Sequence, residues 1–135
     1  MEKLIDIEGI GPAIANILKN QANLVNVEDL LQAGEDPKGR KALAEKTGLP
    51  PKMILRWVNM ADLFRIKGVA EEYSDLLEAA GVDTVVELAR RVPANLHQAM
   101  ADVNRNRALV RRLPTLSDVS AWVEEAKQLD RRVNY

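Results

Sequence analysis

The stretch that decides the fold of this chain is residues 7–15, IEGIGPAIA, in which two glycines flank one aliphatic residue and a helix start follows at once. Glycine takes the positive φ that a tight turn needs, and Pro12 suits the first helical position, where no N–H is required. The amides of Ile10 and Gly11 are expected to point outward at a helix N-terminus, beside the positive end of the helix dipole. The stretch therefore predicts a small anion-binding turn or a turn that only caps a helix.

The same residues resemble the hairpin of helix-hairpin-helix domains, because they match the pattern apolar-x-Gly-apolar-Gly-x-x-x-Ala in full. The resemblance implies that the backbone at Gly9, Ile10 and Gly11 holds a nucleic-acid phosphate without regard to base sequence. Ala13 departs from the family, which often carries Lys or Arg at this position. Lys19, together with Lys3, is left to supplement the amides.

Composition narrows the class of protein. The chain has 135 residues, of which 47% are apolar and 4% aromatic, with 19 basic and 20 acidic residues and no cysteine. A core built from aliphatic side chains is expected, disulfides and thiolate metal sites are excluded, and any contact with nucleic acid must depend on local patches of charge. No apolar run is as long as a membrane span, so we expect a cytoplasmic protein with no membrane contact.

Apolar residues recur at helical spacing throughout the chain, and no long stretch alternates with period two, so the predicted fold class is all-α. Proline, Asn26 and Thr115 mark helix starts, and glycines mark helix ends. The helices are expected at residues 12–20, 26–31, 36–47 and 50–64, and again at 70–80, 83–91, 93–103 and 115–129.

The opening motif returns as IKGVA at residues 66–70, which is 59 positions after its first copy, with Ala70 in place of the second glycine. Trp57 and Trp122 also occupy matching places, so the sequence predicts an internal duplication. We expect two helix-hairpin-helix (SAM-like) repeats, residues 1–65 and 66–135, closed into one pseudo-twofold helical domain. Since residues 1–6 are too few for a full helix before the first hairpin, Trp122 and Val123 on the last helix are expected to pack back on repeat one.

Over residues 7–129 the chain resembles an uncharacterised bacterial family of small proteins with paired helix-hairpin-helix motifs, known only as a domain of unknown function. The resemblance implies the fold and no particular activity.

Charge is segregated in the second half. Residues 71–87 contain six acids and no base, and Glu71 and Glu72 would repel a phosphate at the second hairpin, which we therefore interpret as a structural turn. Six arginines follow between residues 90 and 112. Four of them crowd one segment and could contact a nucleic-acid backbone, pair with the acidic helix of this or another molecule, or form an ordinary solvated face: Arg105, Arg107, Arg111 and Arg112.

No catalytic, cofactor-binding or metal-binding constellation is recognisable, and His97 has no acid-base partner nearby in sequence. The leading hypothesis is a non-enzymatic module that binds the DNA or RNA backbone weakly through Gly9, Ile10, Gly11, Lys19 and the four arginines. The alternative is a module for binding a protein partner or a second copy of itself, in which the hairpins are purely structural.

Overall fold

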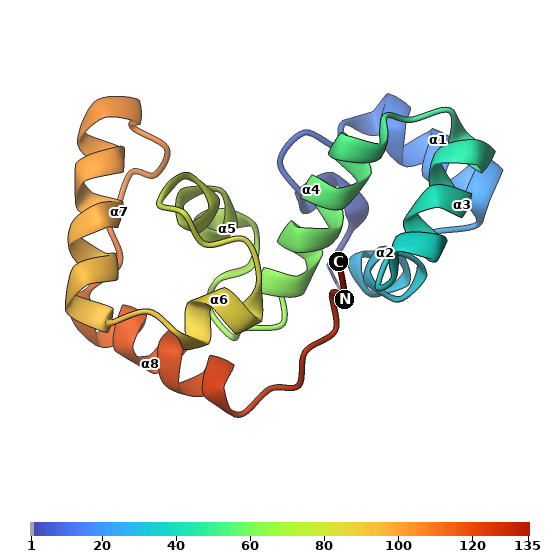
Figure 1. Ribbon diagram of the computed structural model, residues 1–135. Helices are drawn as coiled ribbons and strands as arrows, with labels where there is room; N and C mark the ends of the chain where they lie inside the picture. The colour runs from blue at the N-terminus through green and yellow to red at the C-terminus, as the bar shows by residue number, and fades with distance from the viewer. Residues whose placement is uncertain (1) are drawn as a thin grey trace. The chain divides into compact units, whose positions relative to one another are not determined.

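The computed structural model describes residues 2–135, with the side chains of residues 70 and 71 excepted. Over this range the chain forms helices and no strand, which confirms the predicted all-α class (Figure 1). The elements are a short 3-10 helix η1 (Leu4–Asp6) and the α-helices α1 (Pro12–Ala22), α2 (Val27–Ala33), α3 (Pro37–Thr47), α4 (Pro51–Leu63), α5 (Ala70–Ala79), α6 (Val85–Ala89), α7 (Pro93–Arg107) and α8 (Leu116–Lys127).

Helix starts follow the local signals of the sequence. Proline is the first residue of α1, α3, α4 and α7, where its missing N–H is not needed. Asn26 accepts a hydrogen bond from the amide of Asp29 at the start of α2, and Thr115 accepts one from the amide of Asp118 at the start of α8. Both starts are reciprocal capping boxes, so local residues are sufficient to set them.

The helices form two compact units, which are described separately. The first consists of Met1–Asp62 together with Arg132–Tyr135, and the second of Leu63–Arg131. In the first unit α3 packs on α1 and α2. A Cβ on Gly39 of α3 would lie 2.2 Å from the backbone oxygen of Ala33 at the end of α2. The close approach of these two helices therefore requires glycine at position 39.

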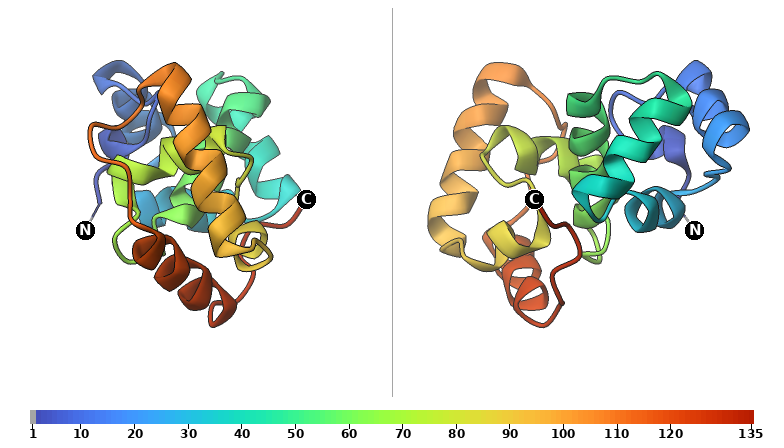
Figure 2. Two further views of the ribbon diagram at one scale, coloured as in Figure 1. Left: turned by 90° about the vertical axis from the view of Figure 1, so that its left-hand side faces the viewer. Right: turned by 45° about the vertical axis from the view of Figure 1, so that its right-hand side comes forward.

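In the second unit α8 packs against α6 and α7, as Figures 1 and 2 show for the helix drawn in red. Val119, Trp122, Val123 and Ala126 are buried in the hydrophobic core of this unit. The ring of Trp122 lies 5.3 Å from that of Tyr73, measured between centroids. Trp122 and Val123 are therefore buried in the core of their own unit, and their packing on repeat one stays a prediction.

What the C-terminus does contribute to the first unit is its last four residues. Val133 is buried, and the amide of Asn134 donates to the backbone oxygen of Glu35 at 2.8 Å. Arg132 forms ion pairs with Glu28 at 2.8 Å and with Glu35 at 2.6 Å. We call residues 132–135 the C-terminal strap. No pattern in the sequence indicated it.

Among the described residues, no helix is both long enough and apolar enough to cross a lipid bilayer.

Candidate nucleic-acid interface

The first turn, residues 7–11, has a defined backbone geometry. The amide of Ile10 donates to the carbonyl oxygen of Ile7 at 3.0 Å, and Gly9 between them has a φ of +93°. The expectation that the amide of Ile10 points outward is therefore wrong, because that donor closes the turn. Gly11, which is exposed and extended, precedes α1 as its N-cap residue.

The donors that remain at this turn are other amides. Among residues 2–135, no acceptor lies within hydrogen-bonding distance of the amides of Glu8, Gly9, Gly11, Ala13 or Ile14. Those of Gly11, Ala13 and Ile14 belong to the first turn of α1, where the helix dipole favours negative charge. Of the residues predicted to bind an anion, Gly9 and Gly11 therefore have amides without an acceptor, and Ile10 does not. The amides of Ala13 and Ile14 are further candidate donors.

Trp57 of α4 lies directly behind the first turn. A Cβ added to Gly9 would be 3.0 Å from the indole Nε1 of Trp57. This side chain is 1% exposed, and its Nε1 has no hydrogen-bond partner in the described part of the chain. Gly9 is therefore required for two reasons, its positive φ and the proximity of the indole.

The second turn repeats this arrangement inside the second unit. The amide of Val69 donates to the carbonyl oxygen of Ile66 at 3.2 Å, and Gly68 has a φ of +90°. A Cβ on Gly68 would lie 3.4 Å from Nε1 of Trp122. Each turn is therefore backed by the tryptophan of its own unit, and the two turns share the closing hydrogen bond and the glycine of positive φ. They differ at the next position, because Gly11 is extended whereas its counterpart Ala70 begins α5.

The second turn already holds an anion. The backbone amide of Lys67 donates to both carboxylate oxygens of Glu125, at 3.1 and 3.2 Å. The position that corresponds to Lys67 in the first turn is Glu8, and the position that corresponds to Glu125 is Met60, which is buried. In the first unit, therefore, no described side chain supplies the carboxylate that the second turn has. Glu72 is exposed beside the second turn, and the side chain of Glu71 lies outside the described residues.

Lys19 and Lys3 come together at a different place. Both line a groove of about 320 Å³ beside η1 and α1. Its other lining residues include Ile5 and Val25, whose side chains are 51% and 59% exposed. Neither Gly9 nor Gly11 lines this groove, so Lys19 is a neighbouring cation on α1 and not part of the turn itself.

The arginine loop, residues 105–112, spans the end of α7 and the segment that follows it. α7 ends four residues later than the sequence predicted, because Ala108 takes a left-handed conformation with a φ of +49°. Asn104 then binds Val110 through two hydrogen bonds, of 2.9 Å from the amide of Val110 and 3.2 Å to its carbonyl oxygen. These contacts give the loop one defined backbone path.

Two further side chains hold the C-terminal side of the loop. The hydroxyl of Tyr73 donates to the carbonyl oxygen of Arg112 at 3.3 Å, and Nε2 of His97 lies 2.9 Å from the carbonyl oxygen of Pro114. Burial, followed by the charge of Glu72, raises the pKa of Tyr73, and Arg112 opposes this shift. His97 thus has a structural contact, which the sequence could not assign.

The guanidinium groups themselves face outward. Arg105, Arg107, Arg111 and Arg112 are all exposed. Arg105 pairs with Asp102 at 3.3 Å, and the side chain of Arg105 is still 69% exposed. Among the described residues, no carboxylate lies within ion-pair distance of Arg107, Arg111 or Arg112. The loop therefore displays three unpaired cations. The first turn belongs to the first unit and the arginine loop to the second.

An acidic cluster lies after α5 in the second unit. Burial, and after it the charge of Glu78, raises the pKa of Asp83. Burial and the charge of Asp83 likewise raise the pKa of Glu87, more than hydrogen bonds and Arg90 lower it. Burial and the charge of Glu78 therefore disfavour the charged form of Asp83, and burial and the charge of Asp83 disfavour the charged form of Glu87. Among the described residues, no group of three His, Asp or Glu side chains is placed to hold a metal ion.

Asp83→Asn should stabilise the protein at pH 7 by a few tenths of a kcal/mol, the scale of one like-charge pair. An acid whose pKa is raised on folding stabilises the folded state when protonated, so this stabilisation is lost as pH rises from about 4 through the raised pKa. The gain from the variant should be present at pH 7 and absent near pH 3 in urea unfolding curves. Glu124→Gln, which removes the exposed partner of Lys127, is the control and should give no such gain. An equal gain in stability at both pH values would contradict the raised pKa of Asp83.

Comparison with known proteins assigns the chain to an uncharacterised family, as the sequence predicted. Residues 8–129 match the model of DUF4332, described as a domain of unknown function, and the chain belongs to this family. No solved structure matches the chain.

Proposed function

We propose that this chain is a non-enzymatic module of two helix-hairpin-helix repeats that binds the nucleic-acid backbone weakly and without sequence preference in the cytoplasm. The observation that carries the proposal is the comparison of its two turns. The second turn holds the carboxylate of Glu125 on the amide of Lys67. The first turn has the same closing hydrogen bond and a glycine of positive φ, and the corresponding amide, that of Glu8, has no acceptor among the described residues. A phosphate oxygen is the external group that would complete the first turn in the same way.

The arginine loop supports the same proposal from the second unit. Its backbone is held by Asn104, Tyr73 and His97, so its exposed guanidinium groups lose less freedom on binding than those of a mobile tail would. Arginine donates two parallel hydrogen bonds to a phosphate. Binding is expected to be weak, because the whole chain has 19 basic and 20 acidic residues and no long-range positive field.

The arginine loop should contribute most of the salt dependence. Replacing Arg107, Arg111 and Arg112 together by Ala should weaken duplex binding at low salt and reduce the slope of log K against log salt by about 3, close to one for each phosphate that these side chains neutralise. Fluorescence anisotropy with two unrelated duplexes and one single strand measures this. The matched control replaces three exposed lysines of α3, Lys38, Lys41 and Lys46, and should leave the slope nearly unchanged.

The first turn is tested at Ala13, which is exposed in the first turn of α1. Ala13→Lys should strengthen binding and Ala13→Glu should weaken it, each by about two- to fivefold, the scale of one exposed ion pair. Glutamate at this position suits the helix dipole, so a loss of binding could not be ascribed to unfolding. Absence of binding by the unmodified protein at low salt and high protein concentration would end the proposal.

The competing proposal, self-association or binding to a protein partner, has one specific observation in its favour. The acidic cluster at Glu78, Asp83 and Glu87 and the arginine loop are opposite charges on one unit, which could join molecules head to tail. Light scattering on the same samples separates the two. A dimer at low salt that dissociates at high salt and is absent in the triple arginine variant would favour self-association, whereas a monomer throughout would count against it.

A further inference from the structure

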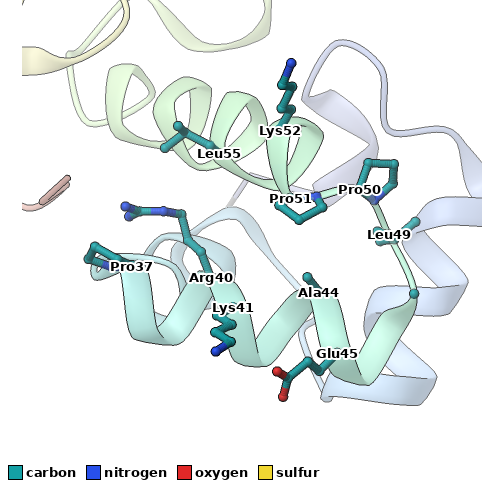
Figure 3. A pocket seen from close by; sticks show the side chains of 11 residues that line it. Pro37, Arg40, Lys41, Ala44, Glu45, Leu49, Pro50, Pro51, Lys52 and Leu55 are labelled. Atoms are coloured by element: carbon teal, nitrogen blue, oxygen red, sulfur yellow. The ribbon is translucent and has the colours of Figure 1, made fainter.

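A further groove lies in the first unit, between α3 and the start of α4 (Figure 3). Its volume is about 660 Å³. The link that joins the two helices, residues 48–50, also lines the groove. Pro50 at the end of this link and Pro51 at the start of α4 limit backbone motion there. Its apolar lining comes from Ala44, Leu49, Pro50, Pro51 and Leu55.

One buried cation also lines this groove. Arg40 is only 8% exposed. Its Nη1 donates to the carbonyl oxygens of Gly34 at 2.8 Å and Glu35 at 3.2 Å, and its Nη2 donates to the carbonyl oxygen of Asn134 at 2.7 Å. The guanidinium carbon lies 5.9 Å from the centre of the Tyr135 ring.

The three hydrogen-bond acceptors of Arg40 are neutral backbone carbonyl oxygens. Among residues 2–135, no carboxylate lies within ion-pair distance of Arg40, and its Nε–H has no acceptor. The two nearest acids on the N-terminal side have other partners: the carboxylate of Asp36 accepts from Nδ2 of Asn134, and that of Glu35 accepts from Nε of Arg132. A desolvated cation with neutral acceptors alone favours an anion at its remaining donors, which include Nε–H.

The side chains around the groove are arranged to suit such an anion. Figure 3 shows Arg40 lying between α3 and α4, whereas Lys41, Glu45 and Lys52 point away from that space. Glu45, the one acid that lines the groove, is therefore directed away from the position where an anion would approach Arg40.

We propose that this groove binds a small organic monoanion with an apolar body, such as an alkyl carboxylate. The carboxylate would accept a hydrogen bond from Nε of Arg40, and the alkyl chain would cover Pro50, Pro51 and Leu55. The volume lies within the range of about 300 to 1,000 Å³ that is usual for small-molecule sites. A single buried cation matches one negative charge, and apolar walls would not compensate the desolvation of a polyphosphate. This site is independent of the nucleic-acid proposal.

The test is a titration of the isotopically labelled full chain with octanoate, followed by amide chemical shifts. Saturable shifts confined to residues 40–55 are expected. The neutral probe 1-octanol should bind at least about fivefold more weakly, because it lacks the charge-assisted hydrogen bond. Shifts spread over the whole chain, or equal affinity for the alcohol, would overturn the proposal.

Two substitutions on α3 make the test specific. Ala44→Phe places a ring in the groove and should weaken octanoate binding by about tenfold or more. Ala42→Phe, at an exposed position two residues away, is the matched control and should leave the affinity within about twofold. Arg40→Lys keeps the charge without the planar fork and should also weaken binding. If Arg40→Lys does not fold, the comparison of Ala44→Phe with Ala42→Phe still tests the proposal. Unchanged octanoate binding by Ala44→Phe would refute the site.

Discussion

Deleting the C-terminal strap, residues 132–135, should lower the free energy of unfolding by about 3–6 kcal/mol, a large part of the 5–15 kcal/mol typical of a domain. The loss has two main sources. Val133 is 2% exposed, and burying a valine stabilises by about 1.5–3 kcal/mol. The carbonyl oxygen of Asn134 is an acceptor for Arg40, and a hydrogen bond to a charged group contributes about 1.5–3 kcal/mol.

The ion pairs of Arg132 add a smaller amount. Burial, the largest single effect, lowers the pKa of Arg132, but its hydrogen bonds and attraction to Glu35 and Glu28 together outweigh burial and raise that pKa. The guanidinium therefore stays charged in the folded state. Because the carboxylate of Glu28 is about half exposed, we expect each pair to contribute no more than about 1 kcal/mol and to weaken in salt.

Urea unfolding and amide hydrogen exchange measure the effect of this deletion. Exchange should accelerate most in α2 and α3, where Glu28 and Arg40 bind the strap. The single change Val133→Ala is the partial control and should cost about 0.5–1.5 kcal/mol, the usual cost of removing a small part of a buried aliphatic side chain. If the truncated chain unfolds within about 1 kcal/mol of the full chain, the strap is not a structural part of the first unit.

Trp57→Ala should be comparably severe, with an expected loss of about 3–5 kcal/mol. The indole of Trp57 fills the space behind the first turn and contacts Gly9, so its removal leaves a cavity beneath the candidate anion-binding amides. Trp57→Phe should cost markedly less. Phenylalanine keeps much of the buried ring and removes an Nε1–H that has no partner within the described residues.

Amide chemical shifts give this prediction a second measurement. In the Trp57→Ala variant, the amide resonance of Gly9 should shift and that of Gly68 should not, because each tryptophan lies behind the turn of its own unit. Trp122→Ala, the matched control, should give the reverse pattern. Equal shifts at both glycines in either variant would show that the pairing of tryptophans with turns described above is wrong.

Much of the candidate site could be predicted because it depends on short-range chemistry. Gly9 and Gly68 have the positive φ that their motifs indicated. The amide of Ile10 could not be assigned from the motif, because a turn of this kind must use one of its own donors to close. The occupant of the second turn, Glu125, is 58 positions from Lys67 in sequence, and no local pattern reports such a pairing.

The sequence by itself determined the all-α class, the helix starts at proline and at capping boxes, and the two glycine turns. Each of these depends on steric and hydrogen-bonding preferences among residues within about four positions of one another. Only the tertiary structure decided that Trp122 packs within its own unit, that the strap joins the first unit, and that Arg40 is buried without a carboxylate partner. The first two outcomes depend on which apolar faces, distant in sequence, pack in the same core. The third depends on which backbone carbonyls lie near the cation once that core has formed. Both are decided by tertiary packing and not by local sequence.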